Sequence, residues 1–363
     1  MLEHSTEEFH WELQKQQAAK LTSSCRAPVS HCGRAMIARS EGSLEPRRPL
    51  ETTSTMPVKT SRARKMIVAV SIVPALAVFI LVFSRIDRPA TVRSYFWLEQ
   101  RLVDNWPVDS QRWEIQKLVP VMCRIGILGP VRVEVEPHVS FLLDPRDLVS
   151  VTILRVGSWQ PEIWNSMSPV LSEGSVFLDV GAHIGYFSMK GAVKVGKTGH
   201  VLAFEPNPET PRLLRDNVAA SHADNVIVEP IACTDREQTL TLYAGPSFNT
   251  GMSSLARENV PVEGAEKPYR VRGRKIDDVI RELNLMRVDA IKIDVEGAEG
   301  YVLRGAFETL KRFHPRLAIE VVPAQLANLH TTPEDIESLL HEAGYNHSKP
   351  LNTPVTDWEW SVQ

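Results

Sequence analysis

The sequence contains little cysteine. Its 363 residues include four, Cys25, Cys32, Cys123 and Cys233, and these are scattered along the chain. Their spacing matches neither a metal-ligand pattern nor a paired framework. A domain held together by disulfide bonds is therefore disfavoured, and we interpret the four residues as reduced thiols.

The sequence also lacks a strong charge of either sign. The formal net charge is −3, which gives no reason to expect a polyanionic partner, so we expect no binding to nucleic acid. The composition, 43% hydrophobic and 23% charged, is typical of a globular protein with one large domain and additional segments. No internal repeat or low-complexity tract interrupts the chain from Val176 onward.

One long apolar run stands out. Residues Met66 to Ser84 read MIVAVSIVPALAVFILVFS and carry no charge. As a helix rising about 1.5 Å per residue, the run extends ~28 Å, close to the thickness of a bilayer core. We interpret it as a single transmembrane signal anchor, because a buried core helix rarely lacks a polar face and no convincing cleavage site follows. Basic residues flank both ends, so the positive-inside rule does not fix the orientation.

The anchor divides the chain into segments. Residues 1–60 show no sustained period and are predicted to be disordered. Met56 begins a short basic segment directly before the apolar run, so we hypothesise that residues 1–55 are an over-long start. Residues 85–125 form a connector, and residues 126–363 form the main domain, with its core at 171–323.

Strands and helices alternate through the main domain. The segment Val131 to Asp144 predicts a hairpin. Strands are expected at 176–180, 200–206, 225–232, 288–297 and 316–322, and helices at 186–195, from Asn207 onward, 277–283, 300–313 and 332–344. Strands rich in Val and Ile, each followed by a helix, predict an α/β fold with a mostly parallel sheet and helices on both faces.

The stretch VFLDVGAHIGYF links the first of these parallel strands to its helix. Gly181 lets the backbone turn tightly and approach a ligand, and Gly185 lets the next helix pack closely. The spacing G-x-x-x-G differs from the G-x-G-x-x-G of dinucleotide-binding proteins, and Asp179 would repel a pyrophosphate. Glu205 ends the next strand and can accept hydrogen bonds from a ribose. A ligand with an amine, a ribose and no phosphate fits this set, and S-adenosylmethionine is such a ligand.

The fourth parallel strand supplies the candidates for chemistry. Alternation along the strand predicts that Lys292, Asp294 and Glu296 share one face near its carboxyl end. Methyl transfer requires an aligned hydroxyl and a group that accepts its proton, so Asp294 is the preferred base or hydroxyl orienter, with Glu296 second. A structural network of Lys292 with the carboxylates is the alternative. Asp294, Glu296 and Glu299 together could hold a divalent cation, but we expect no metal.

Four blocks of the sequence resemble one known family. In order, they read FLDVGAHIGYFS, VLAFEPNPE, NTGMSSL and IKIDVEGAEGYVLRGA, and they look like the FkbM family of S-adenosylmethionine-dependent methyltransferases over about residues 131–323. The resemblance implies a Rossmann-like class I methyltransferase fold and O-methylation of a hydroxyl, often on a sugar or polyketide. Where the family usually has Asn, this chain has His183, which we take as a neutral hydrogen-bonding substitute or as a sign of a changed pocket.

The resemblance also assigns residues to the cofactor. It implies that Asp179, Gly181 and Gly185, with His183 between them, hold the methionine end, and that Glu205 holds the ribose. Ala232 and Asp235 would lie near the adenine, although Asp235 also fits an ordinary turn.

A polar loop further along the chain carries Asn249, Ser253 and Ser254. These side chains could meet a hydroxylated substrate, although such clusters are also ordinary turns.

The sequence therefore favours a membrane-anchored O-methyltransferase whose acceptor is a sugar, a lipid-linked glycan or a secondary metabolite. Two alternatives stay open, an S-adenosylmethionine-binding protein without turnover and a NAD-dependent oxidoreductase. An amino-methyltransferase of nucleic acids is disfavoured, because the chain has DVEG where such enzymes have a D/N-P-P-Y/F/W turn. The cofactor is made in the cytosol, so we expect the catalytic domain on the cytosolic face. The sequence does not determine the oligomeric state.

Overall fold

The computed structural model describes residues 89–90, 92–96, 118–124, 126, 128–261, 268–351 and 357–362. The predicted disordered segment 1–60 and the predicted anchor 66–84 lie outside these residues, as does most of the connector. Within the described ranges, every helix is too short or too polar to cross a bilayer.

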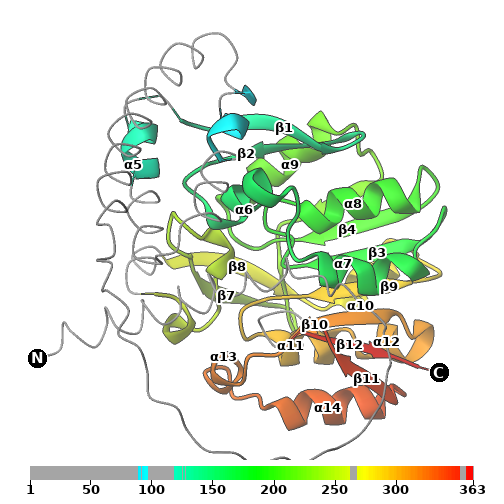
Figure 1. Cartoon of the computed structure of the whole chain (residues 1–363). Coiled ribbons are helices and arrows are strands. Elements are labelled where there is room, and N and C mark those ends of the chain that lie inside the picture. The colour runs from blue at the N-terminus through cyan, green and yellow to red at the C-terminus, as the bar shows by residue number, and fades with distance from the viewer. Residues whose placement is uncertain are drawn as a thin grey trace, which may run out of the picture. The chain divides into compact units, whose positions relative to one another are not determined.

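A seven-stranded sheet forms the centre of the described domain (Figure 1). Five strands are parallel to one another, and β12 runs antiparallel to both of its neighbours. In spatial order the strands are β11 (His347–Pro350), β12 (Asp357–Ser361), β10 (Arg316–Glu320), β9 (Ala290–Ile293), β3 (Val176–Val180), β4 (His200–Phe204) and β5 (Val226–Glu229). The chain winds outward in one direction from β3 and in the other from β9, so the strand order reverses between these two strands. The predicted mostly parallel α/β sheet is confirmed.

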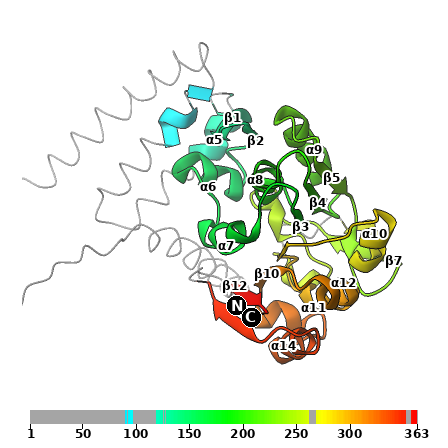
Figure 2. The same cartoon turned by 90° about the vertical axis from the view of Figure 1, so that its right-hand side faces the viewer.

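Helices cover both faces of this sheet (Figure 2). Val176, Leu178 and Val180 of β3 face a core shared with α10 (Ile276–Glu282), α11 (Glu299–Gly305), α12 (Phe307–Phe313) and α14 (Pro333–Glu342). The alternate positions, Phe177 and Asp179, face α8 (Tyr186–Val195) on the other side. The period of two therefore sorts one strand's side chains between two helical layers.

Two smaller sheets flank the central one. The predicted hairpin is confirmed as β1 (Val131–Glu136) and β2 (Val139–Leu143), and β6 (Ala232–Cys233), β8 (Pro268–Arg274) and β7 (Gln238–Tyr243) form the third sheet. The remaining α-helices are α5 (Leu118–Arg124), α6 (Leu148–Val156), α7 (Pro161–Met167), α9 (Thr210–Ala220) and α13 (Pro323–Ala327). Short 3₁₀ turns are η1 (Ser168–Val170), η2 (Thr250–Met252) and η3 (Arg257–Asn259).

Several predicted boundaries are wrong. The helix expected from Asn207 begins at Thr210, because the Asn207 side chain closes a turn by accepting from the backbone N–H of Glu209 at 3.1 Å. The strand expected at 225–232 divides at Pro230 into β5 and β6. The helix expected at 300–313 divides at Ala306, where the backbone leaves the helical region. By contrast, the capping box at Thr332 confirms the predicted start of the last helix.

The fourth parallel strand is shorter than predicted. β9 ends at Ile293, so Asp294 and Glu296 lie in the turn that follows it. Glu296 has φ of 53° and Gly297 has φ of 104°, and this left-handed backbone ends the strand. Alternation along the strand therefore does not determine the position of the Glu296 side chain. The turn places it instead.

Candidate active site

The glycine turn joins three strands at their carboxyl ends. The backbone N–H groups of Gly181 and Ala182 both donate to the Phe204 carbonyl at the end of β4, at 3.0 Å. Gly181 has φ of 80°, and a Cβ there would lie 1.8 Å from the Asp294 carbonyl oxygen that follows β9. The residue must therefore be glycine, since both its conformation and its close neighbour exclude a side chain. The turn lies between β3 and β9, where the strand order reverses and open α/β sheets bind ligands.

Gly185 serves helix packing. It precedes α8 with φ of 89°, and a Cβ there would lie 2.4 Å from Leu214 Cδ1 of α9. This close approach agrees with the expectation that Gly185 lets neighbouring helices pack tightly. A direct contact of Gly185 with the cofactor stays a prediction.

Asp179 is completely buried beneath the turn. Its Oδ2 accepts from the Ser188 hydroxyl at 2.5 Å, and its Oδ1 lies 3.9 Å from Lys292 Nζ. No described group donates a hydrogen bond to Oδ1. Burial raises the pKa of Asp179, although Lys292 and Ser188 oppose that rise. The cation beside this carboxylate therefore belongs to the protein itself, and the predicted contact with the cofactor's amine stays a prediction.

Lys292 connects the turn to the candidate base. Its Nζ donates to the Gly181 carbonyl at 2.9 Å and lies 3.3 Å from Asp294 Oδ2. It also lies over the ring of Phe187 in α8, 5.6 Å from the centroid. Burial alone would lower the pKa of Lys292, but Asp294 and Asp179 outweigh burial and raise it. The buried ammonium thus stays charged at neutral pH and fixes the carboxylate of Asp294.

Glu205 is held at the end of β4 by two backbone donors. The N–H of His183 donates to Oε2 at 2.8 Å, and the N–H of Asn207 donates to Oε1 at 2.9 Å. Burial raises the pKa of Glu205, while the interaction with His183 and the two backbone N–H groups oppose the rise. Each carboxylate oxygen can accept a further hydrogen bond. This geometry is compatible with the predicted role toward a ribose, which no contact in the structure tests.

His183 links the glycine turn to the polar loop. Its Nε2 lies 2.7 Å from Thr250 Oγ1, within hydrogen-bonding distance. The φ angle of His183 is 50°, which lies in the left-handed region. Asn and His are both enriched in that region, so either residue type can adopt this backbone conformation. The bond to Thr250 was not predicted, because nothing in the sequence relates two positions this far apart.

Serine hydroxyl groups of the polar loop form hydrogen bonds that hold the loop in position. Ser253 Oγ accepts from Asn207 Nδ2 at 3.1 Å and donates to the Thr250 carbonyl at 2.9 Å. Ser254 Oγ donates to the Glu296 carbonyl at 2.7 Å. Asn249 is buried and precedes η2. These bonds give Ser253 and Ser254 a positioning role, and substrate contact by any residue of the loop stays a prediction.

A carboxylate cluster forms beyond β9 and β10. One oxygen each from Asp294, Glu296 and Glu320 lies within 4.8 Å of the other two. Glu296 Oε2 accepts from Gln325 Nε2 at 2.5 Å, and burial together with Asp294 raises the pKa of Glu296 to about 8. Sequence analysis missed Glu320, whose pKa is raised by burial and by these neighbouring carboxylates. Glu320 ends β10, the predicted fifth strand, and the pairing of β10 with β9, which was not predicted, brings it beside Asp294.

Glu299 does not join this cluster, although the sequence analysis considered it as a cation ligand. Its Oε1 accepts from the backbone N–H groups of Val295 at 3.1 Å and Gly297 at 3.2 Å, and so closes the turn that carries Glu296. Burial raises the pKa of Glu299 to about 7. The cluster therefore contains Glu320 in place of Glu299.

The residues predicted near the adenine lie in and beside the third sheet. Ala232 is buried in β6, and Asp235 follows that strand, with Oδ2 3.9 Å from Arg304 Nε of α11. Their roles toward the cofactor stay predictions.

Comparison with known proteins agrees with this geometry. The family model described as "Methyltransferase FkbM domain" matches residues 179–346. Methyltransferase sdnD of Sordaria araneosa is 30% identical over 204 residues, which cover 48% of this chain and 75% of that protein. The hexuronic acid methyltransferase AglP of Haloferax volcanii is 26% identical over 191 residues, covering 51% of this chain and 66% of AglP.

Coverage of a further relative is much smaller. The AMB antimetabolite synthetase AmbE of Pseudomonas aeruginosa is 30% identical over 218 residues, which cover 52% of this chain but 10% of AmbE. The family match lies on the strands and turns that build the site, and the separate alignment with sdnD covers three quarters of that relative. The chain is a methyltransferase and belongs to the FkbM family.

Proposed function

We propose that this methyltransferase uses S-adenosylmethionine and transfers its methyl group to a hydroxyl of a sugar, a glycan or lipid-linked acceptor, or a secondary metabolite. The observation that carries the proposal is the placement of Asp294, whose side chain is 23% exposed directly beside the glycine turn. An ion pair with buried Lys292 holds this carboxylate in place. A relative that is named a hexuronic acid methyltransferase supports an acceptor rich in hydroxyls.

The residues around the turn fit the cofactor. Asp179 Oδ1 is buried, lies 3.9 Å from Lys292 Nζ and has no described hydrogen-bond donor, so it has room to accept a hydrogen bond from the amine of the cofactor. Glu205 stands at the end of the next strand with lone pairs left for ribose hydroxyls. When bound, S-adenosylmethionine supplies a methyl group on a cationic sulfur, which leaves with the bonding electron pair as the acceptor oxygen attacks.

The protein's own work is alignment and proton transfer. Asp294 accepts the proton of the acceptor hydroxyl, and Lys292 fixes the direction of that carboxylate through its 3.3 Å contact. The Ser254 bond to the Glu296 carbonyl and the His183 contact with Thr250 hold the polar loop against the same strand ends. Fixing these groups before the acceptor binds reduces the entropic part of the barrier.

Titration calorimetry separates this proposal from its alternatives. We expect S-adenosylmethionine to bind the wild type and NAD not to bind, with binding weakened in Glu205→Ala. A labelled-methyl transfer assay on glycan and lipid extracts then tests turnover. Binding of NAD alone would favour an oxidoreductase, and cofactor binding without transfer to any fraction would favour a protein without turnover.

We further propose, from the apolar run alone, that residues 66–84 anchor the protein in a membrane with its catalytic domain on the cytosolic side. Such an anchor would bring the enzyme to membrane-associated acceptors. Protease treatment of intact vesicles tests the orientation. Protection of the domain inside cell-derived vesicles of known sidedness would oppose a cytosolic placement.

A further inference from the structure

The cluster of Asp294, Glu296 and Glu320 has the dimensions of a cation site. The oxygens that it offers lie within 4.8 Å of one another. Two ligands on opposite sides of one ion are about 4.2 Å apart for Mg²⁺ and about 5 Å apart for Ca²⁺, given their usual bond lengths to oxygen. The three oxygens are therefore close enough for side-chain rotations to bring them around one ion.

A second observation comes from hydrogen bonding at Glu320. This side chain is 8% exposed, and its Oε2 has no hydrogen-bond donor among the described residues. A buried carboxylate oxygen without a partner is costly unless a cation or a proton compensates it. Because an oxygen of Glu320 lies within reach of Asp294 and Glu296, a compensating ion would be shared by all three.

The positive charge nearby is shared among several groups. Lys292 Nζ lies 3.3 Å from Asp294 but gives its hydrogen bond to the Gly181 carbonyl, and its second acidic neighbour is Asp179. Gln325 gives Glu296 a neutral donor. When all three carboxyl groups are ionised, their negative charge exceeds the one ammonium charge described beside them, so a cation or protons must balance the rest.

We infer that Asp294, Glu296 and Glu320 bind a divalent cation of the Mg²⁺ or Ca²⁺ class, which takes oxygen ligands. Asp294 and Glu296 are partly exposed and give the ion access, while Glu320 forms the buried side of the site. Three protein ligands leave coordination positions for water or for an acceptor oxygen. This inference revises the sequence-based expectation of no metal, which rested on a set containing Glu299.

The cation would deepen the proposed function, and this step rests on that function. An acceptor hydroxyl that binds the ion through its oxygen has a lowered pKa, because the ion stabilises the alkoxide. Its proton then passes to Asp294 or to a water on the ion, and the oxygen lone pair becomes available to form the new C–O bond. The ion would thereby select acceptors that present a hydroxyl free to coordinate.

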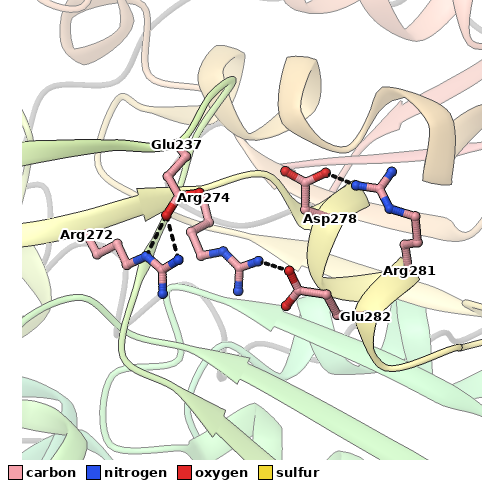
Figure 3. A network of polar contacts seen from close by, with 6 residues as sticks. All are labelled: Glu237, Arg272, Arg274, Asp278, Arg281 and Glu282. Atoms are coloured by element: carbon pink, nitrogen blue, oxygen red, sulfur yellow. Dashed lines mark hydrogen bonds and ion pairs between the residues drawn. The ribbon is translucent and has the colours of Figure 1, made fainter.

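Calorimetry with metal salts alone tests the site. The full chain, in mild detergent and freed of metal with EDTA, is titrated separately with MgCl₂, MnCl₂ and CaCl₂. We expect one ion per chain in the wild type and at least ten-fold weaker binding in Glu320→Gln. Glu237→Gln is the matched control, because that carboxylate is exposed and already paired with Arg272 (Figure 3).

Two further variants keep the result interpretable if Glu320→Gln folds poorly, which circular dichroism reports. Asp294→Asn, at a more exposed ligand, should weaken binding similarly, and Glu320→Asp should retain part of it. Absence of binding to the wild type, or equal binding by wild type, Glu320→Gln and Asp294→Asn, would show that shared protons compensate the cluster and would overturn the inference.

Failure of this inference is distinguishable from failure of the proposed function. The titration needs neither S-adenosylmethionine nor an acceptor, so its outcome does not depend on transfer. If the wild type binds a cation, EDTA should abolish labelled-methyl transfer and the bound cation should restore it. Transfer that is insensitive to EDTA would overturn the catalytic role of the ion, while it would leave methyltransferase activity itself established.

Discussion

The acidic side chains of this protein occupy two contrasting environments. On β8, α10 and the turn before β7, three acids each pair with an arginine, as Figure 3 shows for Glu237 with Arg272, Glu282 with Arg274 and Asp278 with Arg281. The acids of these pairs are partly or largely exposed. At the ends of β3, β9 and β10, by contrast, the acids are buried or half-buried and share one ammonium group.

The difference indicates what each set of charges does. Exposed ion pairs contribute roughly 0–1 kcal/mol each, so the paired surface can vary with little effect on folding. Buried acids without full compensation cost stability, and such groups concentrate where a protein needs an unusual pKa or a ligand. The following predictions test this contrast with variants matched across the two regions.

The largest effect is expected for the candidate base. Asp294→Asn should reduce kcat for methyl transfer by about 10²–10⁴-fold, because the amide cannot accept the acceptor's proton. Asp278→Asn makes the same chemical change within an exposed pair and should leave kcat near the wild-type value. Initial rates with methyl-labelled cofactor measure both, and nearly equal rates in the two variants would refute the assignment.

The buried ammonium should dominate stability. Lys292→Met leaves Asp179 and Asp294 without their cation and should lower the free energy of unfolding by about 3–5 kcal/mol. Arg272→Met, on the exposed network, should lower it by less than about 1 kcal/mol. Urea denaturation followed by circular dichroism measures both. Similar losses in the two variants would remove the contrast.

Glu299 should make stability depend on pH. Its pKa rises from 4.5 to about 7 on folding, so between these values the folded protein holds a proton that the unfolded chain has released. The stability contributed by this proton is complete below about pH 4.5, is lost as pH rises through 7, and amounts to about 3 kcal/mol.

Glu299→Gln removes this titration while keeping an acceptor for the N–H groups of Val295 and Gly297. In EDTA, its free energy of unfolding should fall less between pH 5 and pH 8 than that of the wild type. Glu282→Gln, in an exposed pair, should show the wild-type slope. Parallel slopes for Glu299→Gln and the wild type would contradict the prediction.

A smaller effect is expected where His183 contacts Thr250. His183→Asn keeps a residue suited to the left-handed backbone but shortens the side chain, so the bond across to the polar loop is lost. We expect KM for the acceptor to rise about two- to ten-fold, since one hydrogen bond contributes about 0.5–1.5 kcal/mol. The cofactor's Kd should change little, and Thr250→Val should reproduce the acceptor effect. A change confined to cofactor binding would count against this coupling.

The smallest effect is predicted for Glu237→Gln. This variant loses an ion pair whose two side chains are 57% and 62% exposed. Its free energy of unfolding should stay within about 0.5 kcal/mol of the wild-type value, and high salt should remove the difference. A loss of several kcal/mol would show that the exposed network stabilises the fold after all.

Local patterns predicted most of the fold. Strand period, the capping residues at Thr332 and the glycine turn all depend on neighbours in sequence, and the structure agrees with each. One boundary failed where a tertiary contact intervenes, at Gly305, where a Cβ would lie 2.0 Å from the Thr234 carbonyl just before the break at Ala306. No periodicity in the sequence records such an approach.

The site was predicted in part for the same reason. Asp294 and Lys292 could be found because they lie on one recognisable segment. Glu320 joins them only through the parallel pairing of β10 with β9, and His183 meets Thr250 only through the folding of a distant loop. Glu299 illustrates the opposite error, since nearness in sequence to Glu296 did not place its carboxylate in the cluster.

The contact between Gly181 and the Asp294 carbonyl has a consequence for protein engineering. The turn predicted to hold the cofactor and the segment that carries the candidate base meet with no room for a methyl group between them. Neither part can therefore be exchanged as an independent module. A library designed to change the acceptor should keep both backbones fixed and diversify polar-loop positions other than Thr250, Ser253 and Ser254, whose bonds hold the loop in place.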